Sequence, residues 1–148
     1  MELVEDLPLG DDLAVDNPAV RARLADWYVK AAGLKNTSAR LLTALSKGQT
    51  PGPEASIGKL VAGNMMQDIA KFALDLQGLG GALTDPDVAE GAARFQAMLL
   101  RSPAVRIEGG TDQILRNIIA ERVLGLPEDM RADKGIPFNQ IPTGGARQ

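Results

Sequence analysis

The sequence predicts an all-α protein, folded as an antiparallel (up-and-down) four-helix bundle. Aromatic residues make up only 3% of the 148 residues, so a core must be built from Leu, Ile, Val, Ala and Met. That set suits helices better than β-sandwiches. Apolar residues also recur at helical spacing in four segments separated by short turns, which favour antiparallel neighbours. No segment shows a convincing strand pattern.

Three parts are expected along the chain. Residues 1–16 read as an irregular acidic lead-in, because they carry no Lys or Arg and contain Pro8 and Gly10. Residues 17–126 hold the helical bundle, and residues 127–148 form an extended or partly disordered tail without periodicity. With 45% hydrophobic residues, the chain is long enough for one domain with a core of its own.

The first helix is predicted over residues 17–47. Asn17 suits the N-cap, and Pro18 suits the first helical position, where a missing N–H costs nothing. Lys47 and Gly48 close the helix, since a cation suits its negative end and a glycine can take positive φ. Positions at alternating steps of four and three form the seam, as expected for a helix packed in a bundle. They are Val20, Leu24, Trp27, Ala31, Leu34, Ser38, Leu41 and Leu45.

The second helix is predicted over residues 54–77, after the turn TPGP, which ends at Pro53. Gly58 and Gly63 each weaken this helix by about 1 kcal/mol relative to Ala. Their presence is explained if another helix or a ligand comes close to the backbone. Its apolar stripe consists of Ile57, Val61, Met65, Ile69, Phe72 and Leu76.

The third helix is predicted over residues 86–102. Asp85 and Pro86 are expected to open it, and the pair Ser102-Pro103 is expected to stop it because proline disrupts a continuing helix. Its apolar face is formed by Val88, Ala92, Phe95 and Leu99.

The fourth helix is predicted over residues 112–124, after the sequence RIEGGT. Thr111 is a good N-cap, and Asp112 places a negative charge in the first turn, four residues before Arg116. Its inward residues are Leu115, Ile118, Ile119 and Val123. On this interpretation, the segment is a well-formed helix start and nothing more.

A second interpretation of the same residues is a binding site. Gly109 and Gly110 expose backbone N–H groups at the positive end of a helix, where a phosphate binds readily. Gly80 and Gly81, at the end of the second helix, would likewise let a ligand approach the backbone. The residues alone leave both interpretations open.

Composition excludes several kinds of chemistry. The chain has no His and no Cys, which removes disulfides, thiol catalysis, imidazole bases and almost every transition-metal site. The net charge of −3 gives no general attraction to nucleic acid. No apolar run approaches the roughly 20 residues of a membrane span, and no signal-peptide pattern opens the chain. We expect a cytoplasmic protein with no metal, nucleic-acid or membrane partner.

The segment IEGGTDQILRNIIAERVLGLP resembles the last helix of acyl-CoA dehydrogenases of the actinobacterial type. RLADWYVKAAGL and PGPEASIGKL resemble the two preceding long helices of that family, and DLQGLGG resembles the point where the family places a glutamine and two glycines against flavin. The resemblance covers residues 18–127. The final motif and PGPEAS together are more specific than any single glycine pattern.

This resemblance implies the C-terminal four-helix domain of a flavoprotein that desaturates acyl-CoA thioesters at the α and β carbons. FAD would be the cofactor, acyl-CoA the substrate, and a homo-oligomer or a heteromeric flavoprotein the assembly. In the family, residues matching Gln77, Gly80 and Gly81 touch the adenosine and pyrophosphate side of FAD, commonly that of a neighbouring subunit. Residues matching Thr111 and Gln113 hold the FAD of their own subunit. The candidate cofactor-binding residues are Gln77, Gly80, Gly81, Gly109, Gly110, Thr111 and Gln113.

Two departures from the family matter. The family's N-terminal helical domain, its β-domain and the helix that opens the C-terminal bundle lie outside this sequence, so the chain alone is expected to be catalytically silent. Family members with a base in the final motif read Tyr-Glu-Gly-Thr. Anchoring on Thr111 puts Gly109 at the base position and Glu108 one residue early, an offset that swings the side chain by a large angle. Glu108 is thus a candidate base displaced from the family's position, and some members carry the base on an earlier helix.

A rival hypothesis is a non-catalytic helical module for oligomerisation or interaction. A helical unit with uncovered apolar surface tends to associate with itself or with a partner. Nucleic-acid binding is disfavoured, because the chain is acidic and has no basic–aromatic stripe.

Overall fold

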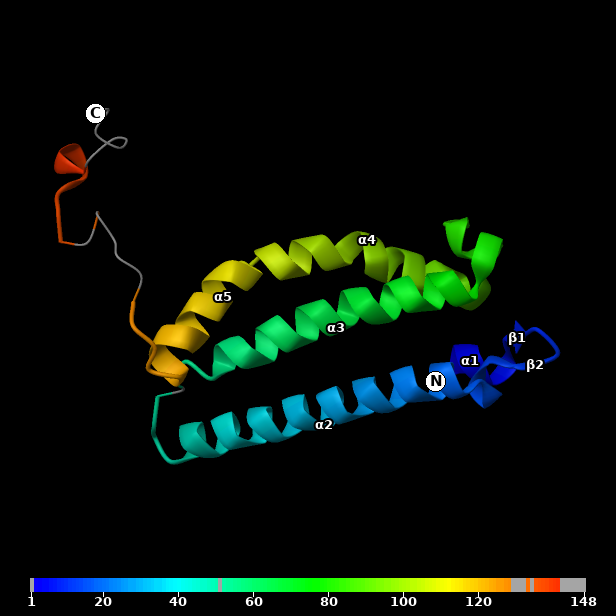
Figure 1. The fold of residues 1–148 in the computed structure, drawn as a ribbon, viewed down its shortest axis with the longest axis horizontal. Helices are drawn as coiled ribbons and strands as arrows, with labels where there is room; N and C mark the ends of the chain where they lie inside the picture. The colour runs from blue at the N-terminus through cyan, green and yellow to red at the C-terminus, as the bar shows by residue number, and fades with distance from the viewer. Residues whose placement is uncertain (1, 51, 129–132, 134, 142–148) are drawn as a thin grey trace.

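The computed structural model describes residues 2–50, 52–128, 133 and 135–141. Its longest elements are helices: α2 (Pro18–Ser46), α3 (Ala55–Leu76), α4 (Arg94–Ile107) and the shorter α5 (Asp112–Ile118). Helix α3 lies in the middle and packs against α2, α4 and α5. Helices α2, α3 and α4 run in alternating directions, whereas α5 continues from α4 toward the same side (Figure 1). The described residues are therefore mainly helical, as predicted. The closed four-helix bundle stays a prediction.

The N-terminal residues form a small folded unit. It consists of α1 (Glu2–Asp6), a hairpin of β1 (Pro8–Leu9) and β2 (Asp12–Leu13), and the 3-10 helix η1 (Ala14–Asp16). The expectation of an irregular lead-in is therefore wrong for these residues. Their few apolar side chains pack together against the start of α2. This packing could not be predicted from the acidic composition of residues 1–16. The buried cluster is Val4, Leu7, Ala14 and Val20.

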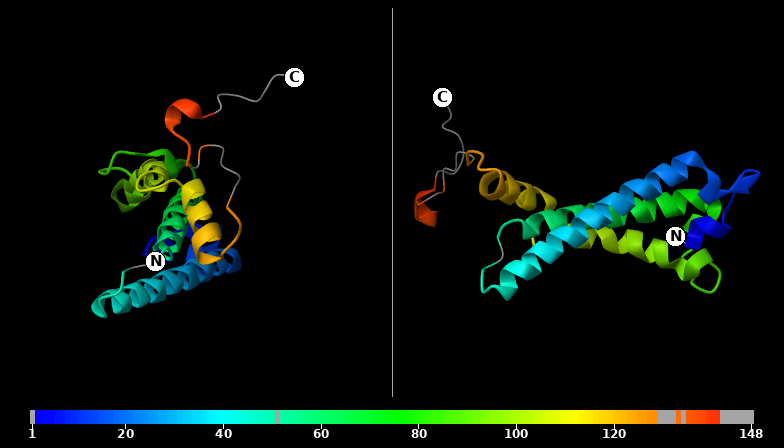
Figure 2. Two further views of the ribbon diagram at one scale, coloured as in Figure 1. Left: turned by 90° about the vertical axis from the view of Figure 1, so that its left-hand side faces the viewer. Right: turned by 90° about the horizontal axis from the view of Figure 1, so that it is seen from below.

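Helix α2 starts as predicted, but its seam is buried over only part of its length. Asn17 Oδ1 accepts hydrogen bonds from the backbone amides of Ala19 at 2.9 Å and Val20 at 3.4 Å. Trp27 is buried, whereas Leu45 near the far end is 49% exposed. Figure 2 shows α2 crossing α3 at an angle, so α2 packs best near its N-terminal half.

A mixed polar and aromatic contact joins α2 to α3. Asp68 of α3 accepts hydrogen bonds from Arg23 at 2.8 Å and from the indole N–H of Trp27 at 2.9 Å. The rings of Trp27 and Phe72 meet edge to face, with centroids 5.3 Å apart. Asp68 therefore helps to fix the point where the helices cross.

Helices α3 and α4 approach closely at Gly63, which is buried. A Cβ at this position would lie 3.4 Å from Cγ of Arg106 and 3.8 Å from Cγ1 of Val105. Gly63 therefore fits the expectation that another helix comes close to the backbone. Gly58 does not, because the space beside it is open.

Helix α4 starts at Arg94, later than the predicted third helix. Asp85 caps only one turn, in which its Oδ1 accepts a hydrogen bond from the Asp87 amide at 3.0 Å. Residues 91–93, within η3 (Glu90–Ala93), then adopt left-handed φ values of 61°, 51° and 56°. Left-handed residues cannot continue a right-handed helix. The prediction of a helix from residue 86 is therefore wrong.

The predicted stop at Ser102-Pro103 is also wrong, because α4 runs through Pro103 to Ile107. A proline lacks the N–H that would bond to the carbonyl four residues earlier. Here that carbonyl belongs to Leu99, and the Ser102 hydroxyl donates a hydrogen bond to it at 2.8 Å. The fully buried Ser102 thus supplies the donor that Pro103 lacks.

The last helix is shorter as an α-helix than predicted. After α5 the chain continues as a π-helical turn, η4 (Ile119–Val123). The tail expected over residues 127–148 lies largely outside the described residues, although Phe138–Gln140 forms a 3-10 turn, η5. None of the helices in the described ranges is long and apolar enough to cross a membrane.

Candidate functional site

The predicted site residues lie at the two ends of α3. Gln77 caps the C-terminal end of α3, and η2 (Gly78–Ala82) follows directly. The start of α5, at Thr111, lies against the opposite end, where α3 and α5 pack together. Lys59 and Asn64, which hydrogen-bond Gly110 and Asp112, lie 18 and 13 residues before Gln77, so the two groups are about 20–27 Å apart along α3 at 1.5 Å per residue. The structure therefore does not bring the two groups into one site.

The start of α5 is capped by the protein itself. Thr111 Oγ1 accepts a hydrogen bond from the Ile114 amide at 3.3 Å, and the Thr111 carbonyl accepts one from the Leu115 amide at 2.9 Å. The N-cap prediction is confirmed. Gly109 and Gly110 have φ of 63° and 111°, a region that favours glycine. The turn from α4 into α5 thus accounts for both glycines without a ligand.

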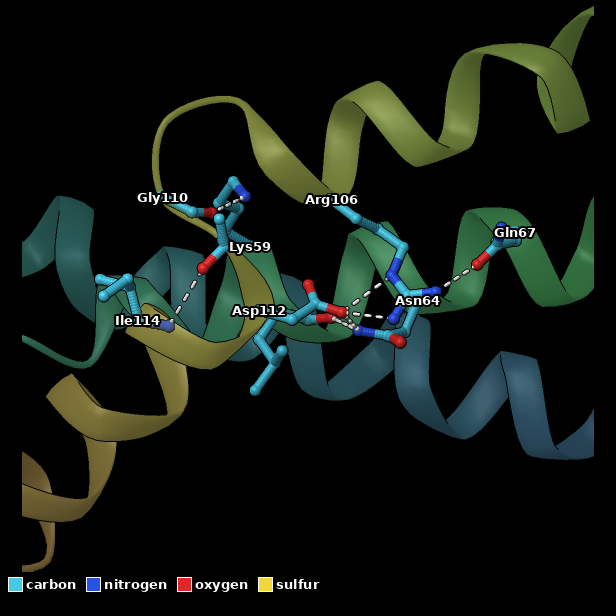
Figure 3. A network of polar contacts seen from close by, with 9 residues as sticks. Lys59, Asn64, Gln67, Arg106, Gly110, Asp112 and Ile114 are labelled. Carbon is cyan, nitrogen blue, oxygen red and sulfur yellow. Dashed lines mark hydrogen bonds and ion pairs between the residues drawn. The ribbon is translucent and has the colours of Figure 1, made fainter.

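Asp112, the first residue of α5, is a buried ion-pair partner. It is 4% exposed and accepts hydrogen bonds from Arg106 Nε at 2.8 Å and Asn64 at 3.2 Å (Figure 3). Burial by itself raises the pKa of Asp112, but the hydrogen bonds from Arg106 and Asn64 and the charges of Arg106 and Arg116 bring this pKa below its ordinary value. Arg106 is the ion-pair partner, at 2.6 Å, while Arg116, the expected partner, acts only through its charge.

Further bonds clamp this junction to α3. Lys59 donates to the carbonyl of Gly110, and Arg106 donates to Gln67 as well as to Asp112. Figure 3 shows Arg106 reaching from α4 between Asp112 and Gln67. Together with Asn64, these α3 side chains set the direction in which α5 leaves α4.

A cleft of about 240 Å³ lies beside the start of α5. Gln113 lies at its edge with an exposed side chain, whereas Arg106 and Asp112 are already engaged with each other. A ligand in this cleft would therefore meet backbone groups and the Gln113 side chain rather than an unpaired charge. Its lining residues are Gln67, Pro103, Arg106, Ile107, Thr111, Asp112 and Gln113.

Glu108, the candidate base, caps the C-terminal end of α4 in an extended conformation. Its carboxylate accepts two hydrogen bonds from Arg101, at 2.7 and 2.8 Å, and its side chain is 54% exposed. Glu108 is not part of the lining of the cleft beside α5. To take a proton from a ligand, it would first have to leave Arg101.

At the other end of α3, two glutamines form an incomplete pair. Gln96 of α4 is 4% exposed, and its Nε2 donates to Gln77 Oε1 at 3.2 Å. Gln77 Nε2 and Gln96 Oε1 are buried and have no hydrogen-bond partner among the described residues. Such groups are few in folded proteins, and each calls for an explanation.

The predicted glycines Gly80 and Gly81 differ in their surroundings. A Cβ at Gly81 would lie 2.5 Å from the carbonyl oxygen of Leu74, so the packing of η2 against α3 requires a glycine there. Beside Gly80 the space is open. Of these two glycines, Gly80 is the one that leaves space for a ligand beside the backbone.

An apolar groove of about 320 Å³ runs between α2 and α3 near α1. It contains most of the predicted stripe of α3, which is half-buried rather than buried. The residues that line it are Leu3, Val4, Leu24, Trp27, Tyr28, Ala31, Met65, Ile69, Phe72, Ala73, Leu76 and Phe95.

Sequence reasoning missed the residues that complete each end. Arg106 lies six residues before Asp112, across a glycine turn, which matches no helical spacing rule. Gln96 lies next to Phe95, and its burial depends on how α4 meets α3. Only the polar character of Gln96 within an apolar helix could have singled it out. Among the described residues, no group of three or more His, Cys, Asp or Glu is placed to hold a metal.

Comparisons with known proteins match most of the chain. Residues 4–124 match the family model described as the acyl-CoA dehydrogenase C-terminal domain. Acyl-CoA dehydrogenase IpdE1 of Mycolicibacterium smegmatis is 34% identical over 118 residues, and that of Mycobacterium tuberculosis is 32% identical over 118 residues. Each alignment covers 80% of this chain but only 28% and 29% of the respective relative. The chain thus spans less than a third of their length.

A solved structure shares the fold. One chain of the ChsE4-ChsE5 complex from Mycobacterium tuberculosis superimposes with a TM-score of 0.71 at 23% identity, over 86% of this chain and 33% of that chain. At this identity, the likeness shows the arrangement of helices and carries no residue-level role.

Proposed function

This chain belongs to the acyl-CoA dehydrogenase family, whose C-terminal domain it matches over residues 4–124, and we propose that it supplies cofactor-binding and subunit-interface surface to an FAD-dependent enzyme. That enzyme removes hydrogen from the α and β carbons of an acyl-CoA thioester. When bound, the flavin supplies the hydride acceptor. This chain's own residues bind and orient the cofactor and contribute the interface.

The separation of the two candidate groups carries the proposal. Gln77 lies about 20–27 Å from the start of α5, because Asn64 and Lys59, which contact that start, lie 13 and 18 residues before Gln77 along α3. Two half-sites so far apart are suited to two cofactor molecules rather than one. This agrees with the roles that the resemblance implies: Thr111 and Gln113 toward the chain's own FAD, and Gln77 toward that of a neighbouring subunit. The assembly would then be a homo-oligomer or a heteromer.

The residues present fit such a cofactor at the Gln77 end. Gln77 Nε2 has no hydrogen-bond partner among the residues that the structure describes, and the open space beside Gly80 leaves room for a ligand against the backbone. At the other end, the cleft beside α5 reaches Gln113 and Thr111. Gly109 and Gly110 would contribute backbone N–H groups there, although the turn geometry already accounts for these glycines.

The catalytic base of the complete enzyme is proposed to lie outside this chain. Glu108 is exposed and bound to Arg101, so it is not held ready to remove an α-proton. The chain alone is therefore expected to be inactive. Purified chain mixed with acyl-CoA, FAD and an artificial electron acceptor should reduce none of the acceptor, and measurable turnover would contradict this part.

The four-helix bundle itself belongs to the same proposal. The apolar groove between α2 and α3 would be covered in the complete enzyme by further helical structure, which would close the bundle. The cytoplasmic location expected from the sequence likewise stays a prediction.

Isothermal titration with FAD tests the cofactor contact directly: we expect weak, saturable binding, and no heat at millimolar FAD would contradict it.

A second candidate function is a non-catalytic helical interaction module. Its support is the exposed apolar surface, which includes Tyr28 at 77% and Leu100 at 75% exposure. Light scattering after size-exclusion chromatography separates the candidates. Self-association with no FAD binding would favour the module, whereas FAD binding would favour the enzyme domain.

A further inference from the structure

The incomplete glutamine pair at the end of α3 is the least explained feature of the described structure. The Gln96 amide donates to Gln77 Oε1 at 3.2 Å, while Gln77 Nε2 and Gln96 Oε1 stay buried without partners in the described part of the chain. This result does not depend on which way each amide is turned. A single hydrogen bond between two carboxamides uses one amino group and one carbonyl, so one of each is always left.

The two glutamines lie at the two ends of a connecting segment whose backbone is itself unusual. Gln77 precedes this connection, residues 78–95, and Gln96 follows it. The connection consists largely of 3-10 turns and exposed residues, and it includes Ala92 and Ala93 at φ of 51° and 56°. Positive φ is unfavourable for alanine. Strained backbone of this kind clusters at ligand-binding and switch regions. The unpartnered carboxamide groups and the left-handed alanines thus occur in the same part of the molecule.

We propose that Gln96 is, with Gln77, a binding residue for the adenine end of the FAD placed there by the proposed function, on which this inference rests. An adenine base presents a donor, its amino group, next to a ring-nitrogen acceptor. A carboxamide pairs with that edge through one donor and one acceptor, which are the two groups that the glutamine pair leaves unused. Because both atoms are covered in the unliganded chain, the 78–95 connection must shift to admit the base, and its 3-10 turns and left-handed alanines suit it to move.

A purely structural role predicts different behaviour. If the pair existed only to hold α3 and α4 together, replacing it with apolar side chains of similar shape would weaken the fold or leave binding unchanged. If the pair exists to bind adenine, the same replacement removes two unsatisfied buried groups. Stability then stays the same or rises, while binding is lost.

The test uses the full chain labelled with ¹⁵N, with ADP as the adenine probe and FMN as the flavin probe without adenine. ADP should shift the side-chain amide signals of both Gln77 and Gln96, identified from their absence in Gln77→Met and Gln96→Met. The dissociation constant for ADP should rise about tenfold in Gln96→Met, the loss of one good hydrogen bond, while FMN binding should be the same in both proteins. Gln49→Met, at an exposed glutamine beyond the end of α2, is the matched control and should bind ADP like the unaltered chain.

The outcomes separate the inference from the proposed function. Absence of any ADP or FAD binding to the unaltered chain would contradict the cofactor contact itself, and the inference with it. ADP binding that shifts Gln77 but not Gln96, and that survives Gln96→Met, would overturn the inference alone. A Gln77→Met/Gln96→Met double variant that melts well below the unaltered chain and still binds ADP would show that the pair is structural.

Discussion

Beside the N-terminal half of α3, the buried carboxylate of Asp112 accepts hydrogen bonds from Arg106 and Asn64. At the end of α3, the equally buried carboxamide of Gln96 donates one hydrogen bond, and its carbonyl has no partner within the described part of the chain. Both side chains are 4% exposed, so burial does not distinguish them. The two side chains differ in the number of their hydrogen-bond partners.

The two ends of α3 have different roles. A complete buried network fixes geometry, because every group that leaves it loses a partner. An incomplete one costs about 1–3 kcal/mol for each unsatisfied group, a cost that folding alone gives no reason to retain. The Asp112 end therefore reads as an anchor for α5, and the Gln96 end as a surface completed by something from outside.

Breaking the anchor should give the largest effect. Arg106→Met leaves Asp112 buried without its ion-pair partner and should lower the free energy of unfolding by about 3–5 kcal/mol. Arg101→Met, which removes only the exposed pair with Glu108, should cost less than about 1 kcal/mol. Urea denaturation of both variants measures the difference. Equal losses would mean that the Asp112 network is not an anchor.

Acid should weaken the same anchor more gently. The pKa of Asp112 is lowered in the folded chain, so its contribution to stability is complete above the unfolded carboxyl pKa of about 4 and is lost as pH falls through the lower folded value. Melting temperatures measured downward from pH 5 should fall more steeply for the unaltered chain than for Asp112→Asn. Parallel curves would assign the acid sensitivity to other carboxyl groups.

The other end offers a matched pair of glycines. Gly81→Ala would place a Cβ 2.5 Å from the Leu74 carbonyl oxygen, so the backbone must shift, at a cost of about 2 kcal/mol. Gly80→Ala meets open space and should leave stability nearly unchanged, while it lowers FAD affinity because the methyl group occupies the ligand's approach. Thermal melts and FAD titrations of both variants check this. A destabilised Gly80→Ala with normal FAD affinity would reverse the assignment.

A smaller effect is expected at the helix cap. Thr111→Ala removes the acceptor for the Ile114 amide and should cost about 1 kcal/mol, whereas Thr111→Ser should keep most of that stability. Chemical denaturation provides the comparison. If serine and alanine behaved alike, the cap would contribute nothing at this anchored end.

Local signals in the sequence predicted the parts of the fold that local physics decides. Asn17-Pro18 and Thr111 begin helices as expected, because a cap and its helix lie within four residues of each other. The prediction of the third helix was wrong because it also rested on a local signal alone. Asp85-Pro86 is a valid local start, and only the left-handed residues 91–93 show that the helix does not continue. Pro103 is tolerated because the neighbouring Ser102 hydroxyl replaces its missing donor.

The site was predictable only in part. Gln77, Gly80 and Thr111 are candidate site residues because of a resemblance that extends over most of the chain, and their role in binding stays a prediction. Arg106 and Gln96 were not predicted, because their roles come from contacts between α3 and α4 that no spacing within one helix reveals. A buried polar side chain is recognised only when its neighbours are known.

The most direct test concerns the claim that the two ends of α3 serve two different cofactor molecules. Light scattering after size-exclusion chromatography, with FAD in the running buffer, measures the mass of the chain as FAD is raised. The account predicts that the mass rises from one chain to an oligomer as FAD binds, and that Gln77→Met/Gln96→Met abolishes the rise. FAD bound to a chain that stays a monomer would contradict it.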